Sequence, residues 1–315
     1  MTAVVIVSWN GRRLLDACLE AVFAQTAPPE TVIVVDNGST DGSVEHLRDR
    51  WPAVRVVALD RNSGIAAGNN AGIRAALDAG AHYILLLNND ADMRTVALAE
   101  LRRALDDAGE GAWAAAPKIL YRSEPGRIWS AGGAFEWWRG VSRDRGTGEP
   151  DRGQYDQAAD IDYANTCCLL VRAATFPRIG LMDEAYFMYF DDSDFSARIR
   201  RAGGRIRYVP GAEVLHDVQA TARVAAAAPN FFALYYTTRN RGRFITRNAP
   251  TAAHRLSAHA FTIVTRFVRA AQACLGGRGA EARLVLGALH DAYVRRETGV
   301  TRRRLNGLPR QDERS

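Results

Sequence analysis

Short apolar runs alternate with amphipathic segments from residue 3 to residue 88. Four runs, at residues 3–8, 31–36, 54–59 and 83–88, are β-branched or leucine-rich and are bounded by Gly, Asn, Asp or Pro. Uninterrupted apolar runs of this length predict strands that are buried on both faces, as in a parallel sheet. Helical spacing fills the gaps, at residues 12–25, 43–50 and 66–79. This alternation predicts a doubly wound α/β sheet.

The pattern changes beyond residue 112. Residues 121–160 are rich in Gly, Arg and Trp, and we expect a long surface excursion there, followed by a strand-like run over 160–172. A short helix is expected over 194–202, because Gly203 and Gly204 provide a C-terminal stop. After His216 the pattern becomes helical and basic. The chain is therefore expected to contain an α/β domain over 1–216 and a helical region over 217–315.

Charge separates the same two regions. Residues 217–315 carry 17 arginines against six acidic residues, a net +11, so the total of +6 leaves −5 for residues 1–216. A basic tail on an acidic body indicates an anionic partner surface, either lipid or nucleic acid.

Residues 252–275 form a basic amphipathic helix in this tail. At 100° per residue, one side of about 80° is basic and much of the rest is apolar; the basic residues are Arg255, His259, Arg266 and Arg269, and the apolar ones include Leu256, Ile263, Val264, Phe267 and Val268. Two interpretations remain open. The helix lies in a membrane interface, or it docks on the α/β domain with its basic side in solvent.

Composition narrows the class of protein. With 315 residues, 47% hydrophobic and 24% charged, the chain is not collagen-like, disordered or a disulfide scaffold. The four cysteines form no CxxC pair, so we expect reduced thiols in a cytosolic protein. We find neither a signal-peptide pattern nor an apolar run long enough to span a bilayer. The expected location is cytoplasmic, with peripheral attachment to the inner face of the plasma membrane if the tail binds lipid.

Acidic residues follow three of the apolar runs, where ligands bind in sheets of this kind. They are Asp36 in DNGSTDGS, Asp90 and Asp92 in LLLNNDAD, and Asp191, Asp192 and Asp194 in YFDDSD. Asp36 alone also fits an ordinary turn or helix cap. Two carboxylates two residues apart at a strand end indicate a hard divalent cation such as Mg²⁺. Clusters of like charge are also concentrated at functional sites.

Two further features could join this acidic set. His216 ends VPGAEVLH; a lone histidine after a strand is usually structural, but imidazole can also complete a divalent site. RNSGIAAGNNAGI lacks GxGxxG, but it offers Asn62, Gly64 and Asn69 at a helix start. Such residues suit a phosphate or nucleoside neighbour, or a tight strand-to-helix packing turn.

Taken in order, five stretches resemble glycosyltransferase family 2, which has the GT-A fold, and are most similar to its rhamnosyltransferase-like members. They are VVIVSWNG, DNGSTDGS, RNSGIAAGNNAGI, LLLNNDAD and FMYFDDSDFSARIRRAGGRIRYVPGAEVLH. The likeness runs over residues 3–216 and continues weakly into YYTTRNRGRF. The fold that it implies is a mostly parallel, doubly wound GT-A sheet with a helical basic C-terminal extension.

The resemblance implies a role for each matching position. Residues at the nucleotide sugar would be Ser8 and Trp9 at the nucleoside, Asp36 on the base, Asn62, Gly64 and Asn69 at the border, and Asn88 and Asn89 in the place of the family's DxD motif. Metal ligands would be Asp90, on the second carboxylate of that motif, His216, and Asp92, which would compensate for Asn88. Asp192 takes the place of the catalytic base, in an acidic pair that reads DD where the family usually has ED.

The activity implied is an inverting sugar transfer that depends on Mg²⁺ or Mn²⁺. The donor would be a nucleoside-diphosphate sugar, with dTDP-rhamnose the first choice and UDP- or GDP-sugars open. The acceptor would be a saccharide, lipid-linked or small-molecule hydroxyl. Trp129, Trp137 and Trp138 would either border the acceptor or pack in the interior.

Three alternatives compete with this interpretation. A nucleotidyltransferase would share the metal carboxylates, but VSWNGRRL does not resemble its Gly-rich triphosphate loop. A nucleic-acid-binding protein would explain the basic tail, but no known nucleic-acid-binding motif accompanies it, so no nucleic-acid partner is expected. An inactive scaffold would not need the acidic set.

Overall fold

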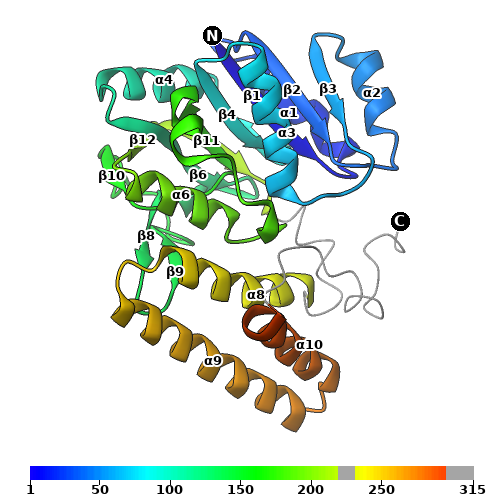
Figure 1. Ribbon diagram of the computed structural model, residues 1–315. Coiled ribbons are helices and arrows are strands. Elements are labelled where there is room, and N and C mark those ends of the chain that lie inside the picture. Colours follow the sequence, from blue (N-terminus) through cyan, green and yellow to red (C-terminus); the bar gives the residue numbers. More distant parts are fainter. Residues whose placement is uncertain (219–230, 296–315) are drawn as a thin grey trace.

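The computed structural model describes residues 1–218 and 231–295, and a mixed ten-stranded sheet forms its centre (Figure 1). The strands of this sheet are β1 Thr2–Ser8, β2 Thr31–Asp36, β3 Val54–Ala58, β4 Tyr83–Asn88, β5 Ala91–Met93, β6 Ala112–Tyr121, β7 Glu124–Ser130, β10 Ala159–Ile161, β11 Cys168–Arg172 and β12 Arg205–His216. Their order is β10-β12-β6-β11-β4-β1-β2-β3, with β5 paired to β12 and β7 to β6. The four predicted strands of the first ninety or so residues are therefore confirmed, and β1, β2, β3 and β4 are parallel.

Helices cover both faces of the sheet, as the doubly wound pattern predicts. They are α1 Arg12–Phe23, α2 Ser43–Arg50, α3 Ile65–Asp78, α4 Ala97–Asp107, α5 Phe176–Ile179 and α6 Asp191–Arg201. Alternate residues of β1 enter different cores: Val5 packs in the core that includes residues of α3 and α6, and Ile6 packs in the core beneath α1, α2 and α4. Burial on both faces is the reason that these strands are continuously apolar.

The register of the sheet brings the predicted site to one edge. Ser8 lies opposite Asp36 in the β1–β2 pair, and Val7 lies opposite Asn88 in the β1–β4 pair. The carboxyl ends of these parallel strands therefore meet, so side chains up to 80 residues apart in sequence share one edge.

Two expectations about the middle of the chain are wrong. Residues 121–160 are not a surface excursion: β7 joins the main sheet, and β8 Gly133–Glu136 pairs with β9 Val141–Asp144 as a separate hairpin. Residues 160–172 do not form one strand, because β10 lies at an edge of the sheet and β11 lies between β6 and β4. The Gly- and Arg-rich composition concealed the strand pattern, although Ile128 and Ser130 of β7 are buried.

The C-terminal region is helical, as predicted. Helix α8 is Phe231–Asn248, α9 is Ala252–Leu275 and α10 is Gly279–His290, followed by a π-helical turn at Asp291–Arg295. In Figure 1, α8 runs beside the β8–β9 hairpin, below α6, and α9 and α10 lie on its far side. Within residues 1–218 and 231–295, no helix has the length and apolar character that crossing a bilayer requires.

Helix α9 is docked, but the side that faces solvent is the apolar one and not the basic one that was expected. Its basic side faces its neighbours: His259 lies 3.0 Å from the Tyr293 hydroxyl, and Arg269 pairs with the buried Glu281 at 2.9 Å. Its apolar side faces outward, with exposed fractions of 74% for Leu256, 60% for Val264, 56% for Phe267 and 50% for Val268. His259 and Arg269 make these internal contacts, whereas Arg255 is exposed, and the exposed apolar side chains give the helix a hydrophobic outer surface.

Candidate active site

Ser8, Asn89 and Asp36 meet at the ends of β1, β4 and β2. The Asn89 amide donates to the Ser8 hydroxyl at 3.0 Å, and both side chains crowd Gly11, where a Cβ would lie 2.2 Å from Asn89 Nδ2. Asp36 is buried; its Oδ2 accepts from the Ser39 backbone N–H at 3.0 Å. Its Oδ1 has no hydrogen-bond partner among the described residues. A buried acceptor without a donor is costly, and a ligand N–H would satisfy it.

The segment before α3 packs closely against its neighbours, as expected for a strand-to-helix turn. Asn62 Oδ1 accepts from the Gly64 N–H at 3.0 Å and from the Asn37 amide at 3.3 Å, which fixes the loop beside Asp36. Gly64 has φ of +91° and lies against Phe187, where a Cβ would come within 2.5 Å of the Phe187 carbonyl oxygen. Gly68 packs against Val7 of β1, and the next residue, Asn69, is buried. The loop is fixed beside the buried Asp36, and the helix that follows packs against β1.

Asp90 and His216 come together from distant parts of the chain. Strand β5 pairs antiparallel with β12, with Ala91 opposite His216, and His216 Nε2 lies 3.2 Å from Asp90 Oδ1. The Trp129 ring packs edge-on against His216, with centroids 4.4 Å apart. His216 Nδ1 is buried and has no hydrogen-bond partner within the described residues. A carboxylate beside an imidazole is a donor set that suits Mn²⁺ or Mg²⁺ when diphosphate oxygens and water supply the other ligands.

Asp92 has a different partner. Its carboxylate forms an ion pair with Arg122, while its Oδ1 is buried without a partner among the described residues. Burial raises the pKa of the Asp92 carboxyl against the lowering effect of Arg122, and the charges of Asp217 and Asp90 raise it further. Within residues 1–218 and 231–295, no three His, Cys, Asp or Glu side chains are grouped as a complete metal site. Asp90 and His216 therefore supply only part of a coordination shell.

The pair Asp191–Asp192 opens α6, three residues earlier than the predicted helix start. Acidic side chains in a first turn are favoured by the helix dipole, so the run DDSD belongs to the helix. Asp192 Oδ2 accepts from the Tyr163 hydroxyl at 2.7 Å, and Oδ1 accepts from the Ser193 N–H at 2.6 Å. Burial raises the pKa of both carboxyls, and raises it further for Asp191, whose ionisation the Asp192 charge also opposes. The hydrogen bonds from Tyr163 and Ser193 favour the charged form of Asp192, so Asp192 is the member of the pair that ionises more readily.

Two residues beside Asp192 were missed in the sequence. Tyr163 orients the carboxylate, and Asp144 at the end of β9 accepts from Ser130 Oγ at 2.5 Å and from the Asn165 amide at 3.3 Å. Burial raises the pKa of Asp144 to about 6, with a further contribution from the Asp192 charge. Neither residue lies in a recognisable motif. Asp144 belongs to residues 121–160, expected to be a surface excursion, and Tyr163 to residues 160–172, expected to be one strand.

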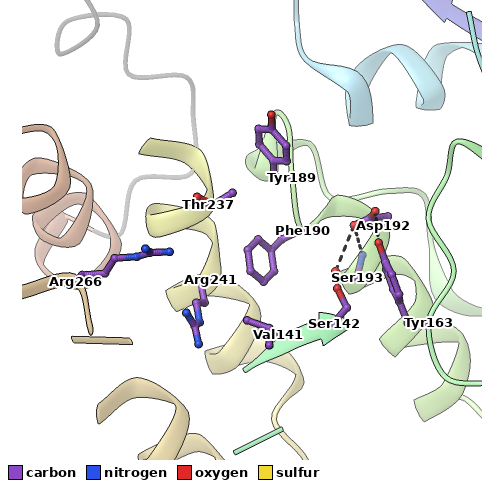
Figure 2. Close-up of a pocket in the computed structure, with 10 residues that line it drawn as sticks. All are labelled: Val141, Ser142, Tyr163, Tyr189, Phe190, Asp192, Ser193, Thr237, Arg241 and Arg266. Atoms are coloured by element: carbon purple, nitrogen blue, oxygen red, sulfur yellow. Dashed lines mark hydrogen bonds between the residues drawn. The ribbon is translucent and has the colours of Figure 1, made fainter. Parts of the chain in front are cut away.

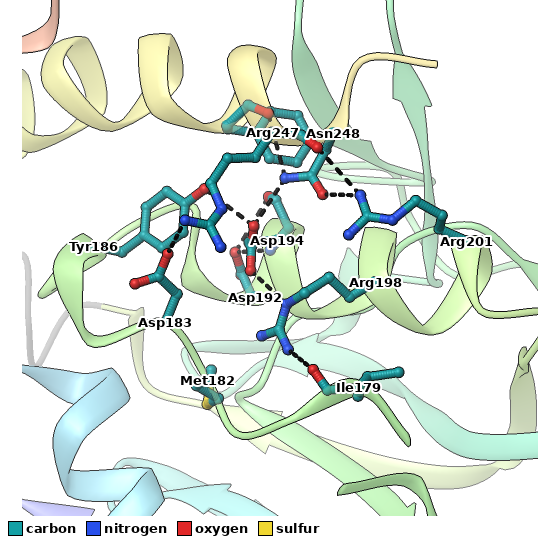
Figure 3. Close-up of polar contacts among 12 residues, drawn as sticks. Ile179, Met182, Asp183, Tyr186, Asp192, Asp194, Arg198, Arg201, Arg247 and Asn248 are labelled. Carbon is teal, nitrogen blue, oxygen red and sulfur yellow. Dashed lines mark hydrogen bonds and ion pairs between the residues drawn. The ribbon is translucent and has the colours of Figure 1, made fainter. Parts of the chain in front are cut away.

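Asp194, the third acid of the run, has a structural role (Figure 3). It is fully buried and accepts from Arg198 Nε at 2.7 Å, Asn248 Nδ2 at 2.8 Å and the Tyr186 hydroxyl at 3.2 Å. Asn248 is the last residue of α8. This carboxylate therefore joins the C-terminal helices to the helix that carries Asp192.

Asp192 opens into a pocket of about 410 Å³ between α6, the β8–β9 hairpin, α8 and α9 (Figure 2). The lining is formed by Val141, Ser142, Tyr163, Tyr189, Phe190, Asp192, Ser193, Thr237, Arg241 and Arg266. Of the predicted site residues, only Asp192 lines it. Ser8, Asp36, Asn88 and His216 instead end strands of the sheet, and Asn69 lies in α3. Asp192 thus stands at the wall of a second compartment, on the side of the C-terminal helices.

None of the three tryptophans considered above lines this pocket. Trp137 stacks on Phe244 of α8 with centroids 5.6 Å apart, and Trp138 is 58% exposed near His254. Trp129 contacts His216. The interior-packing interpretation therefore holds for Trp137.

Comparison with known proteins identifies the family of this arrangement. The family model described as Glycosyl transferase family 2 matches residues 3–167. N-acetylglucosaminyl-diphospho-decaprenol L-rhamnosyltransferase of Mycobacterium tuberculosis (strain H37Rv) is 29% identical over 240 residues, which cover 68% of this chain and 75% of that protein. dTDP-rhamnosyl transferase RfbF of Shigella flexneri is 24% identical over 220 residues, covering 68% of each protein.

Solved structures share the fold at low sequence identity. The crystal structure of S. aureus TarS gives a TM-score of 0.60 at 17% identity, covering 94% of this chain and 49% of TarS. GalNAc-T7 with UDP, GalNAc and Mn²⁺ gives 0.56 at 16% identity, covering 79% of this chain and 51% of that one. The chain spans about half the length of these two proteins. The expected GT-A-type fold with a helical C-terminal region is confirmed.

Proposed function

The chain belongs to glycosyl transferase family 2, and from that premise we propose that it is an inverting, metal-dependent glycosyltransferase with Asp192 as its catalytic base. Sugar transfer is the activity of the family and of the similar rhamnosyltransferases. The observation that carries the finer proposal is the position of Asp192: an ionisable carboxylate, held by Tyr163 and Ser193, at the wall of the pocket between α6, the β8–β9 hairpin, α8 and α9.

The proposed reaction is a single displacement. The acceptor hydroxyl oxygen forms a bond to the anomeric carbon of the donor while the bond from that carbon to the diphosphate oxygen breaks and its electrons leave with the diphosphate. Asp192 takes the hydroxyl proton. A positioned carboxylate accelerates such a step by about 10²–10⁴-fold.

The strand ends are proposed to hold the donor. Asp36 Oδ1 would accept an N–H from the base, and Ser8, Trp9, Asn62, Gly64, Asn69, Asn88 and Asn89 would surround the nucleotide. Asp90 and His216 fit a divalent ion, which when bound would neutralise charge on the diphosphate. We propose that Asp92 does not bind the ion directly, because its carboxylate forms an ion pair with Arg122.

A dTDP-sugar, first of all dTDP-rhamnose, is the proposed donor, on the likeness to the rhamnosyltransferases of M. tuberculosis and S. flexneri. The acceptor is proposed to be a lipid-linked saccharide reached at an anionic membrane surface. The support is the outward apolar side of α9, the net +11 of residues 217–315, and the lipid-linked substrate in the name of the M. tuberculosis relative.

The donor proposal is tested by a thermal-shift panel. Nucleotide sugars are added with Mg²⁺, Mn²⁺ or EDTA, and the true donor raises the melting temperature by mass action, more with the metal than without it. Asp90→Asn should abolish the metal-dependent part of the shift, whereas Asp92→Asn should retain most of it. A shift that is the same in EDTA for the wild type, or equal losses in the two variants, would contradict the assignment of Asp90.

A further inference from the structure

The pocket beside Asp192 contains two arginines that the proposed reaction does not use. Arg241 comes from α8 and Arg266 from α9, and both line the pocket. Figure 2 shows them on one side of the pocket, with Asp192, Ser193, Ser142 and Tyr163 grouped on the other and Phe190 between. The pocket therefore has a negative end at the base and a positive end at the C-terminal helices.

Neither arginine has a carboxylate partner among the described residues. Arg241 is buried and donates through Nε and Nη2 to the Arg139 carbonyl oxygen, which is neutral. Arg266 makes no hydrogen bond or ion pair in the described chain, and its Nε is buried without a partner. Most other partly buried arginines of the molecule are paired, such as Arg198 with Asp194 and Arg243 with Asp183.

The two positive charges also oppose each other. Burial, together with the Arg266 charge, lowers the pKa of Arg241 to about 10. Burial lowers the pKa of Arg266, with Arg269 adding to the effect. Guanidinium groups held together in a partly dry site without an anion are costly, and a bound phosphate relieves that cost through charge-assisted hydrogen bonds.

We infer that Arg241 and Arg266 form a binding subsite for a phosphate or diphosphate group of the acceptor, separate from the site for the donor diphosphate. The inference rests on the proposed function, since it places the acceptor in this pocket. The acceptor sugar would lie between the two ends, over Phe190, with its hydroxyl at Asp192 and its anomeric phosphate at the arginines. The enzyme would then select acceptors that carry phosphate next to the reacting sugar.

The first experiment measures binding without catalysis. Inorganic pyrophosphate is titrated by calorimetry into the full chain in EDTA, which suppresses metal-dependent binding at Asp90. Arg266→Gln should weaken pyrophosphate binding by about tenfold, because one charged donor is lost. Arg255→Gln is the matched control: it removes the same charge from an exposed position of the same helix and should bind as the wild type does. Equal affinity in all three proteins, or equal losses in the two variants, would overturn the inference.

The second experiment measures selectivity. Transfer is followed to a prenyl-diphosphate saccharide and to the alkyl glycoside of the same saccharide. Arg266→Gln should lower the ratio of kcat/KM for the prenyl-diphosphate saccharide to kcat/KM for the alkyl glycoside by about tenfold. A general folding defect would lower both values equally and leave the ratio unchanged. An unchanged ratio overturns the inference. If the wild type transfers sugar to neither acceptor, the proposed function is refuted. If Arg266→Gln loses pyrophosphate binding in that same case, the inferred phosphate subsite is still supported.

Discussion

Asp191 and Asp192 are neighbours in sequence, but their surroundings differ. Asp192 receives a hydroxyl and a backbone N–H, both of which favour its charged form. Burial and the neighbouring Asp192 charge raise the pKa of Asp191 well above its ordinary value. Asp192 is thus the member of the pair that loses its proton more readily, which is the difference that acid–base chemistry requires.

Asp192→Asn should therefore abolish transfer without loss of the fold. The Asn side chain can still accept from Tyr163, but it cannot take a proton, so kcat should fall by about 10²–10⁴-fold. Donor binding, measured by thermal shift, should stay close to that of the wild type. Asp162→Asn, at an exposed carboxylate one residue from Tyr163, should leave kcat unchanged. Turnover near the wild-type value in Asp192→Asn would refute the assignment of the base.

Asp144 predicts a pH dependence of stability. Its pKa of about 6 in the folded state exceeds the ordinary 3.8, so the folded protein binds this proton more tightly than the unfolded chain. The contribution is complete below about pH 4 and is lost as the pH rises through 6. Asp144→Asn removes the charge but keeps an acceptor for Ser130, so at pH 7 it should raise the free energy of unfolding by up to about 3 kcal/mol.

Urea denaturation at several pH values measures this effect. The difference between Asp144→Asn and the wild type should shrink as the pH is lowered from 7 to 4. A difference of constant size across that range would show that burial of the charge is not its cause.

Among the elements, α8 holds the loop that leads to α6, the helix that carries Asp192. Phe187, Tyr189 and Phe190 all have positive φ, between 61° and 67°, a conformation that is strained for residues with side chains. Asn240 of α8 is fully buried and donates to the carbonyl oxygens of residues 186, 188 and 189 at 2.8–2.9 Å. One side chain thus stabilises the strained backbone just before Asp192.

Asn240→Asp should show this dependence. The carboxylate keeps the size of the amide but cannot donate to the three carbonyl groups, so we expect a loss of about 3 kcal/mol in the free energy of unfolding. Activity should fall further than stability explains, because the loop positions Asp192. Thr246→Ala, at a less buried position of α8, is the control and should cost less than 1 kcal/mol. Wild-type stability in Asn240→Asp would contradict this role.

Sequence patterns predicted some elements well and others not at all. Strands β1, β2 and β4 and helices α2 and α9 were predictable because their apolar spacing is uninterrupted. The start of α6 was missed because its first turn is acidic, although carboxylates are favourable there. The side of α9 that faces inward could not be read from its spacing, since the partners of His259 and Arg269 come from residues 281–293. For the same reason the sequence did not show that Arg241 and Arg266 meet at one pocket.

Across the whole molecule, the C-terminal helices pack against the side of the α/β layer that carries Asp192. Arg243 of α8 pairs with Asp183 at 2.7 Å, and Asn248 bonds to Asp194. Residues of α8 and α9 line the pocket beside Asp192, which is the proposed acceptor site. The apolar side of α9 that remains exposed is on the same helix as Arg266, so a surface that bound it would lie close to this pocket.

The proposed contact with an anionic membrane can be tested through three exposed side chains of α9. The combined substitution Leu256→Ser, Val264→Ser and Phe267→Ser removes apolar groups that contribute little to the fold, because each is more than half exposed. Burial of such side chains in a bilayer interface contributes about 1 kcal/mol or more each, so the variant should bind anionic vesicles at least about a hundredfold more weakly in flotation. The Val96→Ser variant, changed at an exposed position at the start of α4, should float as the wild type does.

Neutral vesicles should bind the wild type less tightly than anionic ones, since the basic region no longer contributes to binding. Equal flotation of the triple variant, failure of the wild type to float with anionic vesicles, or a dimer that the three serines dissociate would each exclude the membrane as the partner of this face.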